Sequence, residues 1–193
     1  KHQTLLVREI AHRSGNMLQV VTSIFSQTAR NSDSLAEAKS KFEQRLGQMS
    51  KANLLISNNG WTKCGVRDLV AQTLDLFVDQ VEISGRDVVL PADLCFDLGL
   101  VLHELATNSN KYGAFASDEG RVALRWSVET RDDRQEFVLT WKDSKRQPAA
   151  PVPSTGFGAK LIGQLVESKW RGKVMTELEP TFSCRLSLPL TTG

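Results

Sequence analysis

The chain has 193 residues and a net charge of +2, and 40% of its residues are hydrophobic while 24% are charged. This composition is ordinary for a soluble globular protein, and it excludes wholesale disorder and a collagen-like repeat. No window approaches the roughly 20 apolar residues that a membrane span needs. The nearly balanced charge argues against a general nucleic-acid binder, which usually carries a stronger basic excess.

The three cysteines, Cys64, Cys95 and Cys184, lie far apart and form no CxxC pair. An odd count argues against a disulfide framework. We therefore expect three buried free thiols in a reducing cytosol and a cytoplasmic location. The chain starts with a helical pattern already running and has no signal peptide, which favours a piece of a longer protein.

Residues 1–30 are expected to form one long helix with a narrow apolar stripe, the pattern of a bundle or coiled coil. A polar turn follows at residues 31–34, and Ser34-Leu35-Ala36-Glu37 has the form of a capping box that begins a second helix. Two helices joined by a short turn predict an antiparallel hairpin. Each helix would bury only one face, so the hairpin should dimerise or pack on another part of the chain.

The sequence Ser57-Asn58-Asn59-Gly60 breaks the helical pattern and is the predicted domain boundary. It divides the chain into a helical hairpin, residues 1–60, and a second domain, residues 61–193. The second domain mixes helical and strand periods without strict alternation, which favours an α+β layer: a mixed sheet covered by helices. The expected helices are residues 67–80, 91–111 and 157–170, and the expected strands are residues 81–90 (one strand or a pair), 121–128, 135–142, 173–178 and 182–189.

His12 is the first residue with candidate chemistry. It lies in the middle of the first helix, beside the apolar stripe, and an ordinary imidazole is mostly neutral at pH 7 and can act as a nucleophile. Asn16 lies four residues later on the same helix face, and Arg13 could offset charge on an incoming phosphoryl group. The alternative is an ordinary surface histidine.

Glu104, Asn108 and Lys111 fall on one face of a predicted helix. A carboxylate, an amide and an ammonium in a row are costly against a core, so this face is expected to line a polar pocket. The amide oxygen suits Mg²⁺, the ammonium suits a phosphate, and the carboxylate could orient a proton or a water. The alternative is a solvated helix face, which the apolar opposite side disfavours.

Two further motifs are weaker when taken alone. Gly156-Phe157-Gly158 precedes a helix, where glycines let backbone N–H groups approach phosphate, although a plain loop-to-helix turn explains them equally well. Asp143 ends a strand, where its carboxylate could accept a hydrogen bond from an exocyclic amine or simply lie on the surface. The P-loop pattern and a His/Cys metal-ligand cluster are both absent from the sequence, so an ATP site would have another architecture.

The order of these motifs resembles the sensor histidine kinases, in which a phosphotransfer hairpin precedes a Bergerat-fold (GHKL-type) ATP-binding domain, and is closer still to their HWE subfamily. His12-Arg13-Ser14 with Asn16 resembles the H-R-x-x-N phosphoacceptor box. Residues 103–114 (HELATNSNKYGA) resemble the N box. Trp141-Lys142-Asp143 and residues 156–162 resemble the W-x-E box and the glycine box.

The resemblance implies an ATP- and Mg²⁺-dependent protein histidine autokinase, with His12 as the phosphoacceptor and a response-regulator receiver domain as its partner. It implies that Asn108 binds Mg²⁺ while Glu104 positions metal or water. The other implied roles are nucleotide contacts by Lys111 and Tyr112, adenine recognition by Asp143, approach to the phosphates by Gly156 and Gly158, and orientation of a dephosphorylating water by Asn16. It further implies a sensor domain preceding this chain, and a homodimer through the hairpin is an open alternative to a monomer.

The sequence also departs from the family pattern. Position 143 is Asp where the subfamily usually has Glu, and only Pro148 is left of the Gly-Gly-Pro that usually follows. Gly15 stands where Lys is common. The second hypothesis is therefore a histidine phosphotransferase or response-regulator phosphatase with a degenerate ATP site.

Overall fold

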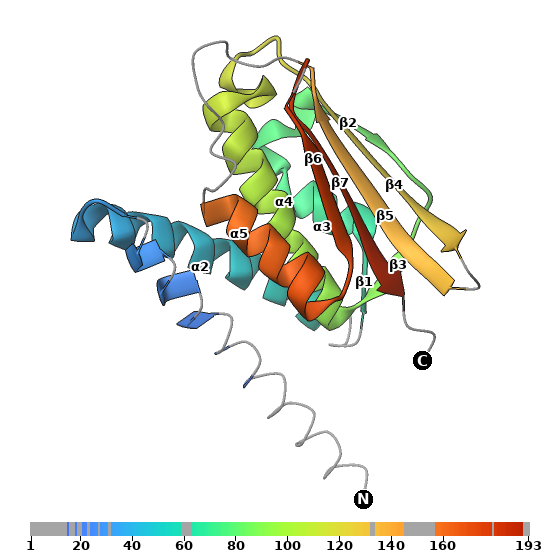
Figure 1. The fold of residues 1–193 in the computed structure, drawn as a ribbon, viewed down its shortest axis with the longest axis horizontal. Helices are drawn as coiled ribbons and strands as arrows, with labels where there is room; N and C mark the ends of the chain where they lie inside the picture. Colours follow the sequence, from blue (N-terminus) through green and yellow to red (C-terminus); the bar gives the residue numbers. More distant parts are fainter. Residues whose placement is uncertain are drawn as a thin grey trace, which may run out of the picture. The chain divides into compact units, whose positions relative to one another are not determined.

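The computed structural model, drawn in Figure 1, describes residues 32–58, 63–131, 134–144, 157–178 and 180–190, together with residues 15, 18, 21–22, 24–26 and 28–30. The chain divides into two compact units, residues 1–47 and 48–193, and each is described by itself. The predicted boundary at residues 57–60 stays a prediction. Within the described part of the chain, no helix is both long and apolar enough to cross a membrane.

In the first unit, helical residues before the turn pack against the start of α2 (Leu35–Asn58). The rings of Phe25 and Phe42 meet edge to face, with 5.4 Å between their centroids. Arg45 Nη1 donates a hydrogen bond to Thr28 Oγ1 at 3.0 Å. These contacts join the two helical segments in the expected hairpin.

The predicted capping box at the start of α2 is present. The backbone N–H of Glu37 donates to Ser34 Oγ at 3.2 Å, which satisfies one of the unpaired donors of the first helical turn. The Glu37 carboxylate accepts a hydrogen bond in return, from the N–H of Asp33 at 2.8 Å. The glutamate thus reaches the residue before the serine, and the two bonds fix where α2 begins.

The second unit is built on a mixed five-stranded sheet with the order β2-β4-β5-β7-β6. Its β2 and β4 are parallel and all its other pairs are antiparallel. A two-stranded antiparallel sheet, β1-β3, lies apart from it. The strands are β1 (Lys63–Gly65), β2 (Val81–Ser84), β3 (Val89–Pro91), β4 (Val122–Arg131), β5 (Arg134–Asp143), β6 (Lys173–Glu177) and β7 (Ser183–Leu190).

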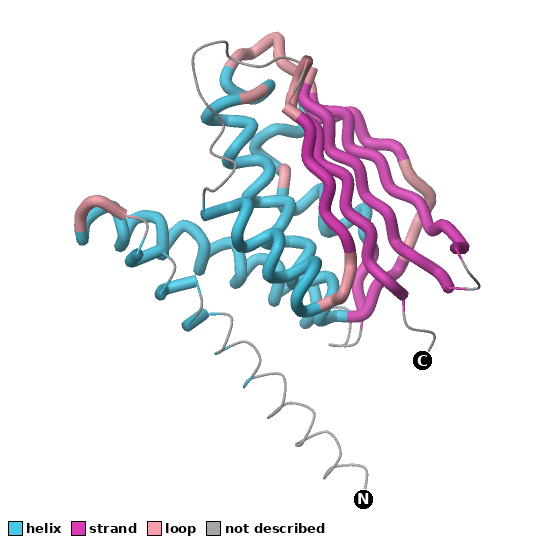
Figure 2. Tube along the Cα trace, viewed as in Figure 1, coloured by secondary structure: helices cyan, strands magenta, loops and turns pink. Residues whose placement is uncertain are grey.

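Helices α3, α4 and α5 cover one face of the five-stranded sheet, as Figure 2 shows. Three short helical segments, η1, η2 and η3, connect or extend the main elements, and η3 is a π-helix. The mixed sheet with helices on it confirms the predicted fold class. The bounds are α3 (Val66–Thr73), η1 (Asp75–Gln80), α4 (Ala92–Tyr112), η2 (Ala114–Ala116), α5 (Phe157–Gly163) and η3 (Gln164–Lys169).

The core lies between this sheet and α4. Trp141 and Phe137 of β5 are fully buried, as are Leu98, Leu102 and Leu105 on α4. Burying a large apolar side chain contributes about 1.5–3 kcal/mol. These contacts fix which face of α4 turns toward the sheet, and therefore which face is left for polar side chains.

Two predicted helices differ from the structure. The helix expected over residues 67–80 ends at Thr73 and continues as the 3₁₀ segment η1, in which Phe77 has a non-helical backbone (φ −122°). The Phe77 ring stacks on Phe115, with 4.1 Å between the centroids, a tertiary contact that local periodicity does not contain. The helix expected over residues 157–170 changes from α to π at Gln164.

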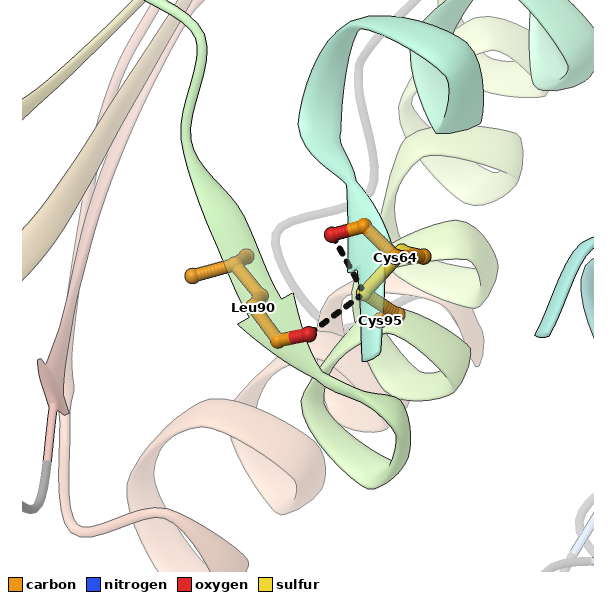
Figure 3. The surroundings of a disulfide bond; sticks show 3 residues. All are labelled: Cys64, Leu90 and Cys95. Atoms are coloured by element: carbon orange, nitrogen blue, oxygen red, sulfur yellow. Dashed lines mark hydrogen bonds between the residues drawn. A yellow bond between two sulfur atoms is a disulfide. The ribbon is translucent and has the colours of Figure 1, made fainter. Parts of the chain in front are cut away.

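The expectation of three free thiols was wrong for two of them. Cys64 of β1 and Cys95 in the first turns of α4 form a disulfide, drawn in Figure 3. Cys64 pairs with Leu90 of β3, and β3 runs directly into α4, so the ladder brings the two cysteines together across 31 residues. Cys184 is free and buried, and burial raises the pKa of its thiol to about 12.

Candidate functional site

The row of polar side chains predicted on α4 runs from buried to exposed along the helix. Glu104 is only 4% exposed, Asn108 is half-buried and Lys111 is exposed. A solvated helix face is therefore the wrong description for the carboxylate of this row. A buried carboxylate is retained only where other groups stabilise it, and Glu104 does have an interaction partner.

Gly158, the second residue of α5, faces this row. A Cβ built on Gly158 would lie 3.0 Å from Glu104 Oε2 and 3.2 Å from Asn108 Nδ2. Only a residue without a side chain fits here without moving those groups. The structure thus places Gly158 against Glu104 and Asn108, while Gly156 lies outside the described residues.

Asp143 ends β5 and is 1% exposed. Its carboxylate accepts hydrogen bonds from Ser109 Oγ at 2.8 Å, from Trp141 Nε1 at 3.1 Å and from the backbone N–H of Ala114. Burial raises the pKa of Asp143, and the three donors partly offset that rise because they favour the ionised form. The alternative of a surface Asp is therefore wrong.

Gly113 lets the end of α4 approach this carboxylate. A Cβ built on Gly113 would overlap Asp143 Oδ2. The backbone N–H of Gly113 donates a hydrogen bond to Ser109 O at 2.9 Å, at the end of α4. The Ser109 hydroxyl also accepts a hydrogen bond from the N–H of Phe115 at 3.2 Å. One side chain, Ser109, thus links the last turn of α4, the following loop and the Asp143 carboxylate.

The loop after α4, residues 113–120, is fixed by contacts with η1 and β5. Phe115 stacks on Phe77 and meets Trp141 edge to face, with 5.8 Å between the last two centroids. Gln80 Nε2 donates to Ser117 O at 2.8 Å and to Gly120 O at 3.1 Å. Residues 113–120 are therefore tied to η1 at these points.

Glu104 and Asn108 in the α4 row also suit a metal ion whose other ligands are water and a substrate phosphate. Among the described residues, no group of three or more His, Cys, Asp or Glu side chains could hold a metal by itself. Mg²⁺ commonly takes only one or two protein oxygens and completes its shell with water and phosphate. The half-buried amide of Asn108 and the carboxylate of Glu104, beside a glycine that leaves space, match that donor set.

The remaining predicted site residues are placed less completely. Lys111 is exposed and Tyr112 is half-buried, both in the last turn of α4 near Gly113. His12, Arg13 and Asn16 lie outside the described residues.

The sequence reasoning missed the residues that support Asp143. Ser109, Gly113 and Ala114 lie in the N-box match and Trp141 in the W-x-E match, but the sequence assigned them no role, because their importance comes from α4 ending beside the end of β5. The available signal was a small hydroxyl, Ser109, on the otherwise apolar side of α4.

Comparison with known proteins gives these features a family. Residues 9–87 match the family model described as HWE histidine kinase. The blue-light-activated histidine kinase of Rhizobium johnstonii is 31% identical over 170 residues, which cover 88% of this chain and 48% of that protein. The protein of the same name from Brucella ovis is 27% identical over 180 residues, which cover 91% of this chain and 37% of that protein. The chain thus spans less than half of either relative.

Solved structures agree on the fold. The blue-light activated histidine kinase of Erythrobacter litoralis EL346 superposes with a TM-score of 0.66 at 13% identity, covering 93% of this chain and 59% of that one. The nucleotide-free catalytic domain of histidine kinase ThkA gives a TM-score of 0.51 at 16% identity and covers 66% of this chain and 94% of that one.

Over most of its length, the chain is similar to histidine kinases. More particularly, its residues 9–87 carry the HWE histidine kinase domain.

Proposed function

We propose that this chain is the kinase portion of a protein histidine autokinase, which transfers the γ-phosphoryl group of ATP to His12 and then to an aspartate of a response regulator. One observation carries the proposal: α4 holds a carboxylate–amide pair against Gly158 at one place and supports the buried Asp143 at another. In this proposal, the carboxylate–amide pair beside Gly158 binds the phosphate end of a nucleotide, and Asp143 binds its base.

At the base end, Asp143 accepts a hydrogen bond from the exocyclic amine of adenine. Ser109, Trp141 and the N–H of Ala114 hold the carboxylate in one orientation, so it need not be ordered on binding. Asp is shorter than the usual Glu but keeps the carboxylate, and Gly113 leaves room for that carboxylate beside the end of α4.

At the phosphate end, Asn108 and Glu104 would hold Mg²⁺ and its water, Gly158 would leave room for the phosphates, and Lys111 and Tyr112 would contact the nucleotide. When bound, Mg²⁺ neutralises charge on the phosphate oxygens. The contribution of the chain is positioning and charge, which is what phosphoryl transfer requires most. Gly156 belongs to the same proposal through the glycine motif.

The phosphoacceptor belongs to the helical hairpin, residues 1–60. Neutral His12 attacks the γ-phosphorus in line, ADP leaves, and Arg13 offsets charge on the transferred group. Asn16 orients water when the kinase dephosphorylates its partner. Since histidine and ATP lie in separate domains in this proposal, the break near residues 57–62 would have to act as a hinge or linker. The remaining parts of the proposal are a receiver domain as partner, a preceding sensor domain, a homodimer through the hairpin and a cytoplasmic location.

The test is autophosphorylation with γ-labelled ATP and Mg²⁺. Labelling is expected to be acid-labile and base-stable, lost in His12→Ala and reduced at least tenfold in Asn108→Ala. The matched control is Gly47→Ala, an exposed α2 position where a Cβ meets nothing within 4 Å, and it should label normally. Unchanged labelling in His12→Ala would contradict the proposal. Phosphate exchange with a receiver domain without ATP binding would indicate a phosphotransferase or phosphatase instead.

A further inference from the structure

Asp97 of α4 is a buried carboxylate that none of the chemistry above uses. It is 2% exposed, and its Oδ2 accepts hydrogen bonds from Trp170 Nε1 at 2.6 Å and from Lys169 Nζ at 2.6 Å. Its other oxygen, Oδ1, is buried and has no hydrogen-bond partner among the described residues. Burying a carboxylate with one unsatisfied oxygen costs stability, so a carboxylate at this position needs a reason.

The position of Asp97 along α4 suggests that reason. Asp97 lies about two helical turns before Glu104, on the stripe that continues to Asn108. Gly158 lies against the Glu104–Asn108 end of this stripe, and Trp170 lies against its Asp97 end. The stretch from Gly158 to Trp170 therefore runs antiparallel along α4 and meets the same stripe at both ends.

The Trp170 end of this stretch is fixed in several ways. The π-helix η3 closes with the N–H of Trp170 bonded to Leu165 O at 3.2 Å. Such π segments are mostly single turns within α-helices and are frequent at functional sites. The Lys169 ammonium lies 5.4 Å from the centroid of the Trp170 ring, and both residues reach the same Asp97 oxygen. The N–H of Gly172 then bonds to Val166 O at 2.7 Å, and the chain turns into β6.

We propose that Asp97 is a positioning residue of the nucleotide site: through Trp170 and Lys169 it sets where α5 lies along α4, and so keeps Gly158 against Glu104 and Asn108. This inference rests on the proposed function, and it adds a residue that touches neither nucleotide nor metal. The fit at this place is tight, since a Cβ added to Gly158 would lie only 3.0 Å from Glu104 Oε2, so a shift of α5 along α4 would take the one residue without a side chain away from the carboxylate–amide pair.

A positioning role and a merely structural role predict different nucleotide affinities for a folded apolar replacement. Removing one partner of a buried ion pair is destabilising, because the groups that paired with it lose their acceptor. Asp97→Leu is therefore expected to lower the melting temperature and, while the chain is still folded, to weaken nucleotide binding, whereas a merely structural role predicts a lower melting temperature with unchanged binding. Asp97→Asn keeps an acceptor for the indole N–H and should rescue binding to within about threefold of the unchanged protein.

The experiment measures affinity for ADP with Mg²⁺ in the full chain for four variants. Asp97→Leu and Trp170→Phe, which replaces the indole by a smaller ring without the N–H, are each expected to weaken binding about tenfold. The matched control is Trp126→Phe, which deletes an indole hydrogen bond to Arg86 O at 2.8 Å in another part of the unit and should leave affinity unchanged. Full affinity in a folded Asp97→Leu would overturn the proposal.

Amide hydrogen exchange, measured without nucleotide, tests the positioning role of Asp97 separately from the proposed nucleotide-binding function. Residues 158–163 should exchange faster in Asp97→Leu and Trp170→Phe, and at the unchanged rate in Asp97→Asn and Trp126→Phe. Unchanged exchange in the first two variants would overturn the positioning role. If the unaltered chain bound no nucleotide, the proposed function would fail, and exchange alone would decide whether Asp97 sets the position of α5.

Discussion

At the scale of single residues, the site depends on two glycines, whose lack of a side chain matters as much as the polar groups around them. Gly113 and Gly158 each allow a backbone segment to approach a carboxylate, Asp143 in one case and Glu104 in the other. Spacing along the sequence predicted Glu104 and Asn108 because the helical repeat alone places them together. It gave no reason for Gly113 or Ser109, since their roles depend on α4 meeting the end of β5.

Gly113→Ala tests the first of these close approaches. The added Cβ would overlap Asp143 Oδ2, so the carboxylate must move away from its donors. We expect a loss of about 1–3 kcal/mol in the free energy of unfolding and at least a tenfold loss of nucleotide affinity. Urea unfolding and a nucleotide titration check both. Gly47→Ala, in open space within α2, should instead gain up to about 1 kcal/mol.

Asp143→Asn tests the burial of the carboxylate through pH. The pKa of Asp143 is raised above its ordinary value of 3.8, so the folded chain holds this proton more tightly than the unfolded chain does. Ionisation of Asp143 therefore subtracts stability as pH rises from 3.8 through the raised pKa. Urea unfolding between pH 4 and 7 should show the unaltered chain losing free energy relative to Asp143→Asn as pH rises. Parallel curves would contradict a raised pKa.

At the scale of elements, periodicity predicted most of the fold. Strands were expected over residues 121–128 and 135–142 and occur as β4 and β5, and a helix was expected after Pro91 and occurs as α4. These elements are long and strongly patterned, so local sequence determines them. The missed features, the end of α3, the π-helix η3 and the disulfide, all depend on contacts between elements distant in sequence.

The disulfide has a measurable effect at this scale. Joining Cys64 to Cys95 closes a loop across 31 residues, and loop-closure entropy makes such a link worth about 3–4 kcal/mol. Reduction with a phosphine should lower the midpoint of urea unfolding by a corresponding amount. The double variant Cys64→Ser/Cys95→Ser should be insensitive to the reductant, since the remaining Cys184 is unpaired. An unaltered chain with the same midpoint before and after reduction would show that the bond contributes nothing.

At the scale of the whole molecule, the proposed phosphoryl transfer requires both units. In that proposal the helical hairpin provides the phosphoacceptor His12, and the sheet with its helices binds ATP. The family was recognisable from the order of motifs along the sequence, because that order survives where individual motifs have degraded. The phosphoacceptor assignment still rests on the sequence motif around His12, whereas the nucleotide site rests on contacts of described residues.

A calorimetric titration of the full chain with a non-hydrolysable ATP analogue and Mg²⁺ tests the nucleotide site most directly. We expect one site per chain, with affinity reduced at least tenfold when Mg²⁺ is removed or in Asn108→Ala, and with Gly47→Ala binding as the unaltered chain does. No heat of binding at millimolar analogue, or equal binding by Asn108→Ala, would contradict the claim that α4, Gly158 and Asp143 together hold a nucleotide.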